Sequence, residues 1–319
     1  MTPGILPVEK LWTLSSQLSA FIHVSEFLQQ LLNGLSLGAI YALIALGYTM
    51  VYGVLRFINF AHSDVFMVGA FIGYYIGQKV PQNTISGGLV VLLGAMLGCA
   101  LLGMLIERLC YRPLRGAATL NVLITAIGVS LLLEYSGQVF FGATPRTFPS
   151  VFPSTNFAFG DLVISSNQVV VIVVTALLMV GLQLIVYRTK IGTAMRAVSL
   201  NPKAAQLVGV NNDVVISFTF GLGSALAAAG GILYALNYPS IDPLMGVMPG
   251  LKAFVAAVLG GIGNIPGAAL GGLLLGTVET FVNGSQWSTY KDAIAFAILI
   301  IILLFRPAGL LGKFSVEKV

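Results

Sequence analysis

Charge is what this sequence has least of. Asp, Glu, Lys and Arg make up 8% of its 319 residues, against roughly 25% in an average soluble domain. Charged residues are missing altogether from five windows, which are 27–55, 80–106, 162–187, 214–241 and 253–278. Each window is longer than the ~20 apolar residues that a helix needs to cross the hydrocarbon core of a membrane. The sequence therefore predicts an all-α, polytopic integral membrane protein with no room for a soluble catalytic domain.

Cysteine and histidine are almost as scarce, with two of each. Cys99 lies inside a predicted span and Cys110 at the end of one, so a disulfide framework is not expected. A nucleotide-binding P-loop needs the pattern G-x-x-x-x-G-K-[ST]. The only Gly-Lys pair, at Gly312, has Pro307 where the first glycine belongs and Phe314 where the pattern needs Ser or Thr. No metal site or catalytic constellation is predicted, so any ATP and Mg²⁺ must bind to another chain.

The hydrophobic pattern predicts eight or nine membrane helices, some of them short or broken. They are expected at about 31–54, 60–78, 86–106, 119–142, 168–187, 214–236, 250–263, 265–282 and 290–305. Basic residues cluster in three connecting or terminal segments: Arg108, Arg112 and Arg115; Arg188, Lys190, Arg196 and Lys203; and Arg306, Lys313 and Lys318. Basic segments favour the cytoplasmic side. The net charge of +5 is thus interpreted as topology, with a cytoplasmic C-terminus, and not as affinity for nucleic acid.

Two segments lie outside this pattern. Residues 1–28 have no continuous apolar core behind a basic start, which argues against a cleaved signal peptide; we expect an amphipathic helix in the membrane interface, followed by a membrane domain over 29–319. Residues 143–167 are rich in Pro, Ser and Thr and fall on the outer side. They are either a docking or lid element or an ordinary exposed connection.

The segment "GLKAFVAAVLGGIGNIPGAALGG" (250–272) is too short and too interrupted for an ordinary span. Its first part, 251–263, rises only about 20 Å as a helix. It ends in Gly260, Gly261 and Gly263, and we expect Pro266 to kink the chain there. Broken segments of this kind point to a transport pathway, so these four residues are candidates for the path. The small-residue stretches 33–47 and 220–236 also suggest an internal repeat, although close helix packing produces the same pattern.

A polar group interrupts the apolar run "RFINFAHSDVFMVGAF" (56–71). A metal site would need more ligands than His62 and Asp64 supply. A proton relay and a contact to substrate remain open, because ionisable residues at membrane depth are often functional. We prefer a structural and gating role. Asn59 and Ser63 would satisfy backbone groups at a helix start, while His62 and Asp64 stabilise the inner mouth of the path. Glu134 is a second buried carboxylate, for which a structural hydrogen bond is expected.

The loop between the spans at 168–187 and 214–236 contains signals for a short helix. Asn201 is a good N-cap, and Pro202 is favoured in the first turn of a helix. Lys203, Ala204 and Ala205 follow, and Gly209 ends the helix. The loop at 188–213 could be a plain connection or a surface for a partner.

The chain resembles the LivH-type permease subunits of bacterial branched-chain (hydrophobic) amino-acid ABC importers. The resemblance runs from about residue 28 to the C-terminus. It rests on "NGLSLGAIYALIALGYTMVYGVLRFINFAH", "IERLCYRPLR", "MRAVSLNPKAAQLVGVN", "GLKAFVAAVLGGIGNIPGAALGG", "YKDAIAFAILI" and "RPAGLLGK". In such permeases an E-A-A-x-x-x-G motif docks on the ATPase. Here Lys203 replaces the acidic residue, while Ala204, Ala205 and Gly209 keep the spacing.

The resemblance implies a transport subunit of the bacterial inner membrane without an ATPase site of its own. Its implied partners are a homologous second permease in a heterodimer, two ATPase subunits and a periplasmic substrate-binding protein. Residues 201–209 would be the coupling helix, with Ala204 and Ala205 facing a groove on the ATPase. Two alternatives stay open: a permease for urea or short amides, and an ion-coupled secondary transporter that would need no ATPase.

Overall fold

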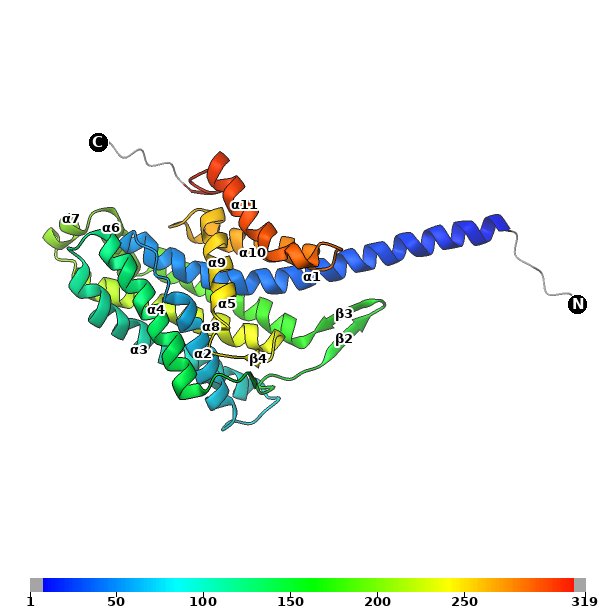
Figure 1. The fold of residues 1–319 in the computed structure, drawn as a ribbon, viewed down its shortest axis with the longest axis horizontal. Coiled ribbons are helices and arrows are strands. Elements are labelled where there is room, and N and C mark those ends of the chain that lie inside the picture. Colours follow the sequence, from blue (N-terminus) through cyan, green and yellow to red (C-terminus); the bar gives the residue numbers. More distant parts are fainter. Residues whose placement is uncertain (1–7, 313–319) are drawn as a thin grey trace, which may run out of the picture.

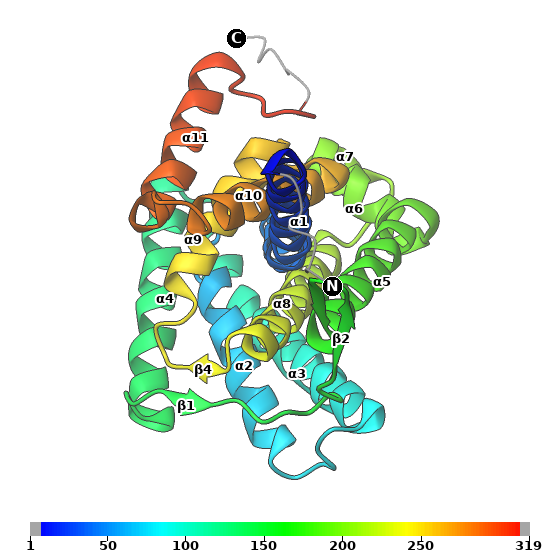
Figure 2. The same cartoon turned by 90° about the vertical axis from the view of Figure 1, so that its right-hand side faces the viewer.

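The computed structural model describes the backbone of residues 8–312 and the side chains of residues 24–312 except Phe159. This part of the chain is a bundle of helices, which confirms the predicted all-α membrane fold (Figure 1). Seven helical segments are long and apolar enough to cross a membrane, and Val247–Gly260 is a shorter apolar helix. Figure 2 looks along the first helix and shows it surrounded by the others.

Most helices begin and end close to the predicted spans, but the first helix starts well before residue 31, and the helix at Lys190–Leu200 was not predicted. Their bounds are α1 Val8–Leu55, α2 His62–Gly77, α3 Ile85–Ile106, α4 Thr119–Phe141, α5 Ser166–Arg188, α6 Lys190–Leu200, α7 Pro202–Leu207, α8 Asn212–Asn237, α9 Val247–Gly260, α10 Ile265–Asn283 and α11 Lys291–Phe305. A π-helical turn at Glu107–Tyr111 and short 3-10 turns at Arg112–Leu114 and Ser288–Tyr290 complete the helical part.

The segment between α4 and α5 has more structure than a plain connection. Strands β2 (Asn156–Phe159) and β3 (Leu162–Ser165) form an antiparallel hairpin. Strand β1 (Arg146–Thr147) pairs with β4 (Ser240–Ile241), which follows α8. The Gln29 side chain on α1 holds the hairpin, because it both donates to and accepts from the backbone of Val163. Neither pairing was predicted from the sequence; the β1–β4 pair joins segments far apart in the chain.

The first four and last four helices repeat one arrangement in opposite orientation. Helix α1 packs against α10 and α9, and its counterpart α8 packs against α3 and α2. In the same way α4 contacts α2, and α11 contacts α9. Helices α1 and α8 run antiparallel, since Asn237 near the end of α8 bonds Ser36 while Gly223, earlier in α8, faces Gly47 further along α1. This arrangement agrees with the predicted internal repeat and is an inverted one.

Glycines allow α1 and α10 to touch. A Cβ added to Gly276 of α10 would collide with the backbone of Gly38 on α1, and one added to Gly38 would lie 2.7 Å from Leu273 Cα. Helices of membrane proteins associate through such small-residue faces, because lipid leaves little hydrophobic drive between helices. The small residues at 33–47 are thus explained by packing as well as by the repeat.

The predicted broken segment is a pair of separate helices. Helix α9 ends at Gly260, and Gly261 and Gly263 adopt positive φ angles of 105° and 89°. Helix α10 then starts at Ile265, capped by the Asn264 side chain, which accepts from the backbone N–H of Gly267 at 3.1 Å. The expected kink at Pro266 is wrong. This proline lies in the first turn of α10, where its missing N–H would have no partner within the helix anyway.

The three basic segments lie at one end of the bundle, which we call the inner end. Arg112 and Arg115 contact Asp213 at the start of α8, and Ser199 on α6 donates to the Gly53 carbonyl. The chain after α11 reaches the same end, where Leu311 donates to the Gly260 carbonyl. The β hairpin lies at the opposite, outer end (Figure 1). The part of the third basic segment beyond Gly312 falls outside the described residues.

The N-terminal segment is continuous with the first span. Helix α1 runs without a break for 48 residues, about 72 Å at 1.5 Å per residue, and its N-terminal part extends past the β2–β3 hairpin and the rest of the bundle (Figure 1). The side chains before residue 24 lie outside the described ones. The placement of residues 1–28 in the membrane interface therefore stays a prediction.

Candidate functional site: polar clusters at the two ends of the bundle

The polar residues before and at the start of α2 are buried inside the bundle. Tyr111, in the π-helical turn, donates to Asn59 Oδ1 at 2.6 Å. His62 is fully buried, with the Tyr48 ring edge-on to it at 4.7 Å between centroids. Asn59 was expected to cap the helix, but no side chain caps α2. Its carboxamide faces Tyr111 instead, and Ser63 satisfies a backbone group by donating to the Phe60 carbonyl at 2.8 Å.

Asp64 and Glu134 lie together between α2 and α4. The Ser130 hydroxyl donates to Asp64 Oδ2, and Glu134 is close enough to interact with the same carboxyl group. Asp64 is buried, whereas Glu134, well inside α4, is only half-buried. The structure thus brings together two of the predicted pathway residues. His62, two residues before Asp64, faces α1 instead, where Gly47 leaves space for its ring.

The predicted coupling helix has the expected local structure. Helix α7 begins after Asn201, whose side chain accepts from the Ala204 N–H at 3.1 Å, and Gly209 follows with a positive φ of 85°. Pro202 lies in the first turn, and its carbonyl accepts from Asn212 Nδ2 at 2.9 Å, which fixes α7 against the start of α8.

The outward face of α7 differs from the one expected. Ala205 is only 3% exposed, because it points toward the protein's own helices, so it cannot face a groove on another protein. Lys203 and Ala204 are exposed. Two apolar side chains the sequence did not single out, Leu207 and Val208, are 89% and 77% exposed. A short polar helix that presents such side chains at the inner end offers a surface for a partner.

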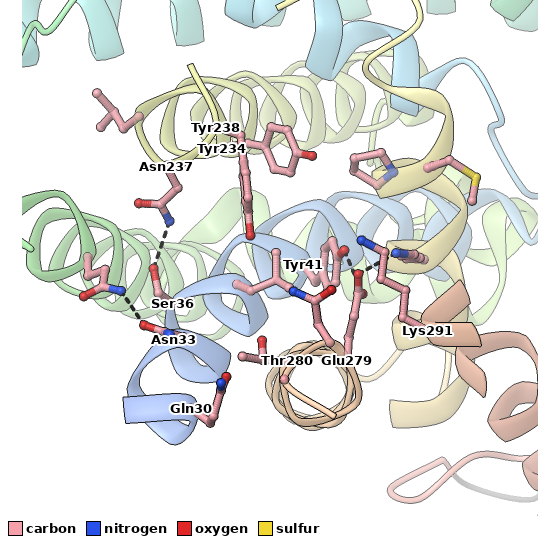
Figure 3. Close-up of a pocket in the computed structure, with 18 of the residues that line it drawn as sticks. Gln30, Asn33, Ser36, Tyr41, Tyr234, Asn237, Tyr238, Glu279, Thr280 and Lys291 are labelled. Carbon is pink, nitrogen blue, oxygen red and sulfur yellow. Dashed lines mark hydrogen bonds and ion pairs between the residues drawn. The ribbon is translucent and has the colours of Figure 1, made fainter. Parts of the chain in front are cut away.

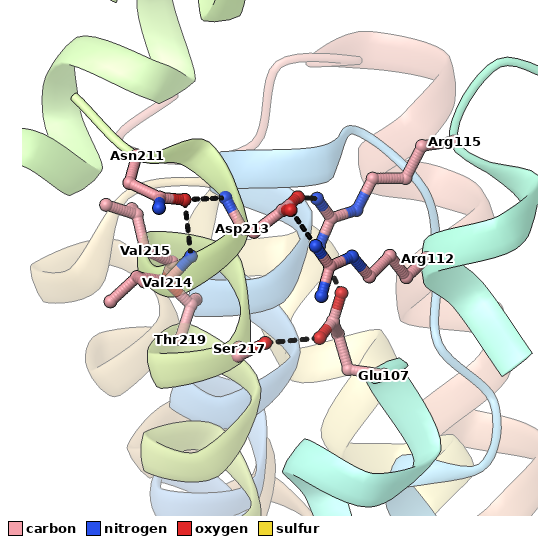
Figure 4. Close-up of polar contacts among 9 residues, drawn as sticks. All are labelled: Glu107, Arg112, Arg115, Asn211, Asp213, Val214, Val215, Ser217 and Thr219. Carbon is pink, nitrogen blue, oxygen red and sulfur yellow. Dashed lines mark hydrogen bonds and ion pairs between the residues drawn. The ribbon is translucent and has the colours of Figure 1, made fainter. Parts of the chain in front are cut away.

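A charged network next to α7 joins α3 to α8 (Figure 4). Glu107, at the end of α3, is completely buried and accepts from Arg115 and from the Ser217 hydroxyl on α8. Arg115 also contacts Asp213, which pairs with Arg112. Burying a carboxylate is costly unless it is paired and hydrogen-bonded, and Glu107 has both kinds of partner.

A second charged network lies at the outer end, and sequence reasoning missed it. Lys252 of α9 and Glu279 of α10 are 6% and 7% exposed, with Nζ 2.6 Å from Glu279 Oε1. Lys252 also lies 2.6 Å from Asp292 Oδ1 on α11. Tyr41 of α1 donates to the other Glu279 oxygen at 2.9 Å. The signal was present: Lys252 and Glu279 border the charge-free window 253–278, inside two segments assigned to the membrane.

This outer network lines a cavity of about 690 Å³. The outer ends of six helices form its wall, and most of the lining is polar (Figure 3). Amide side chains are tied to one another or to hydroxyl groups: Gln168 donates to Asn33 at 2.8 Å, and Asn237 donates to Ser36 at 3.0 Å. Lys291 on α11 completes the charged side.

The two networks occupy equivalent places in the inverted repeat. Each has a buried glutamate near the end of the third helix of its repeat, Glu107 on the α3 side and Glu279 on α10. Each glutamate accepts from a hydroxyl on the first helix of the other repeat, Ser217 of α8 or Tyr41 of α1. Each also pairs with a basic side chain. The candidate site therefore consists of matched charge clusters at opposite ends of one bundle.

The glycines among the remaining pathway candidates lie where backbones approach closely or where φ is positive. A Cβ on Gly260 would collide with the backbone of Gly267, and one on Gly261 would lie 2.6 Å from the backbone nitrogen of Gly312. Both glycines thus allow two backbones to approach, as expected. Gly263 has open space around it, and its positive φ is the reason that glycine is required there.

Comparison with known proteins identifies the family. The family described as "Branched-chain amino acid transport system / permease component" matches residues 30–303. The chain is 44% identical to the high-affinity branched-chain amino acid transport system permease protein BraD of Pseudomonas aeruginosa, over 93% of this chain and 99% of BraD.

It is 42% identical to the permease protein LivH of Escherichia coli, over 92% of this chain and 98% of LivH. A more distant relative is the galactofuranose transporter permease protein YtfT of Escherichia coli, with 26% identity over 82% of this chain and 75% of YtfT. The polytopic helical fold, the short capped helix at the inner end and these alignments lead to one conclusion: the chain belongs to the family of permease components of branched-chain amino acid transport systems.

Proposed function

We propose that this chain is the permease subunit of an ATP-driven importer that carries branched-chain amino acids across the bacterial inner membrane. The observation that carries the proposal is the alignment with BraD and LivH, which leaves almost no part of either relative unmatched. Both are named as permeases for branched-chain amino acids, and this supports leucine, isoleucine and valine as substrates over urea or short amides.

The energy source is assigned to partner subunits. Two ATPases would bind ATP and Mg²⁺ and dock at the inner end, which we assign to the cytoplasm together with the C-terminus. The exposed Leu207 and Val208 at the end of α7 support this contact. Asn212 ties α7 to the start of α8, and Asp213 ties α8 to Arg112 and Arg115. A second, homologous permease would complete the membrane part as a heterodimer, and a periplasmic binding protein would deliver substrate at the outer end.

The inverted repeat supports a mechanism of alternating access. The two halves pack across one another, so that a rocking motion of one half against the other opens one end as it closes the opposite end. A ligand or nucleotide shifts such an equilibrium only by its differential affinity for the two states. The buried clusters of Glu107 and Glu279 each join the two halves, one at each end.

The test is transport by the assembled complex. The permease is co-expressed with candidate ATPases, a second permease and a binding protein from the same organism, purified, and placed in proteoliposomes with ATP inside. We expect co-purification of the ATPases and leucine uptake that requires both ATP and the binding protein. A complex with the P-loop lysine of the ATPase replaced is the control and should take up nothing. Uptake of urea but not leucine, or uptake driven by an ion gradient without ATP, would contradict the proposal.

A further inference from the structure

We propose that the outer cavity is a binding site for a free α-amino acid, with the charged end of the ligand held against Asp292 and Lys291. The inference rests on the proposed function and adds to it a place on this chain where the substrate binds. The cavity volume of about 690 Å³ lies within the range of about 300–1,000 Å³ typical of small-molecule sites.

The cluster of Lys252, Glu279 and Asp292 carries a net negative charge, which Lys291 on the same cavity wall offsets. Lys252 contributes one positive charge, and its two partners Glu279 and Asp292 contribute two negative charges. Glu279 is buried and fully engaged, since its two oxygens accept from Lys252 and Tyr41. The Asp292 side chain is 40% exposed and lines the cavity. An entering ammonium group would therefore find one carboxylate that is accessible and a cluster with an excess of negative charge.

The neighbouring residue supplies the complementary charge. Lys291 precedes Asp292 at the start of α11 and lines the same cavity. An α-amino acid carries its ammonium and its carboxylate on one carbon atom. A lysine and an aspartate at adjacent positions, both on the cavity wall, match that arrangement. Charge-assisted hydrogen bonds of this kind are roughly twice as strong as neutral ones.

The rest of the lining suits a small zwitterion with an apolar side chain. Apolar surface comes from Leu37, Leu236, Met248 and Pro249, and tyrosines add rings with polar ends. The polar groups around them, including Asn33 and Ser36, already have partners within the wall. A lipid chain would bury the charged ends of Lys291 and Asp292 without partners, whereas a zwitterion with a short branched side chain supplies a partner for each.

The site can be tested by protection of a cysteine. Thr280 lines the cavity on α10, and a Thr280→Cys variant is made in a background with Cys99→Ala and Cys110→Ala. The assembled transporter, in nanodiscs without ATP, is labelled with a charged methanethiosulfonate reagent. Leucine is added up to about 50 mM, a range that covers a millimolar Kd. The control is Ser154→Cys, an exposed position outside the cavity.

We expect leucine to slow labelling of the Thr280→Cys variant and to leave the Ser154→Cys variant unchanged. Leucinamide lacks the carboxylate and 4-methylpentanoate lacks the ammonium group. Each should need a concentration at least about tenfold higher, the effect of losing one charge-assisted hydrogen bond. Asp292→Asn should raise the leucine concentration for half-protection by a similar factor. Lys252 keeps Glu279 as its partner in that variant, so the fold is retained, which gel filtration checks.

The outcomes separate this site from the function on which it rests. Equal labelling rates with and without leucine, in a complex that takes up leucine, overturn the site and leave the importer assignment standing. Protection that is the same for leucine and 4-methylpentanoate, or unchanged by Asp292→Asn, also overturns it, because the charged end is then not recognised. A complex that takes up no leucine overturns the proposed function and the site together.

Discussion

Replacing Lys252 by methionine tests how the outer network contributes to stability. Lys252 and Glu279 are 6% and 7% exposed and 2.6 Å apart, so the change leaves a buried carboxylate without its counter-charge. Breaking a buried pair from one side costs about 3–5 kcal/mol. Replacing both partners with uncharged residues of similar shape removes that penalty. We therefore expect Lys252→Met to lose about 3–5 kcal/mol and the double variant Lys252→Met/Glu279→Gln to recover most of it.

The free energy of unfolding is measured by titrating SDS into detergent micelles and following helix content by circular dichroism. Arg112→Gln serves as the control. Its pair with Asp213 has side chains 43% and 41% exposed, and exposed pairs contribute about 0–1 kcal/mol. Added salt should reduce the effect of Arg112→Gln but hardly change that of Lys252→Met, because buried pairs are screened much less. A loss below about 1 kcal/mol for Lys252→Met, or a double variant no better than the single one, would refute this account.

Three further predictions concern α7, the central packing and the topology. Leu207→Asp should abolish co-purification with the ATPases and change the unfolding free energy by less than about 0.5 kcal/mol, since Leu207 is almost fully exposed. Ala205→Glu should instead destabilise the permease itself, because Ala205 is buried. Gly276→Val should prevent a monodisperse gel-filtration peak, because its Cβ meets the α1 backbone, whereas Gly128→Val, with open space around it, should not. A single cysteine at Lys203 should react with impermeant thiol reagents only from the cytoplasmic side, and one at Ser150 only from the outer side. Labelling of both from one side would reject the topology.

The sequence was sufficient to predict the membrane helices but not which helices and side chains contact one another. Long charge-free windows set the spans, because a helix is the one way to satisfy the backbone in lipid within a single segment. Local signals also worked for α7, where Asn201, Pro202 and Gly209 act within one or two turns. The direction of a side chain on so short a helix could not be read, since it depends on where α6 and α8 lie. For this reason Ala205 was placed on the wrong face.

Proline was misjudged for a related reason. Pro266 within an apolar run was interpreted as a kink, because periodicity alone does not show whether one helix bends or a second helix begins. The decisive signal is local: Asn264, two residues earlier, is an N-cap residue, and Gly261 and Gly263 before it allow the positive φ angles of a reversal. The spans expected at 250–263 and 265–282 already placed a boundary here, and the cap and the glycines indicate that it is a turn between two helices and not a kink at Pro266.

The buried charges were the hardest feature to predict, and the inverted repeat explains why. Glu107 meets Ser217, 110 positions away, and Glu279 meets Tyr41, 238 positions away. In both cases the third helix of one repeat lies against the first helix of the other, so the hydroxyl partner comes from the opposite half of the chain, whereas the basic partner, Arg115 or Lys252, comes from the same half. A search for polar residues within a few positions of each glutamate finds neither of these hydroxyl partners. Once α1 and α8 are recognised as equivalent, however, the buried glutamate at one end of the bundle predicts the other. A weak similarity between two small-residue stretches is thus the most useful guide that this sequence offers to its own polar sites.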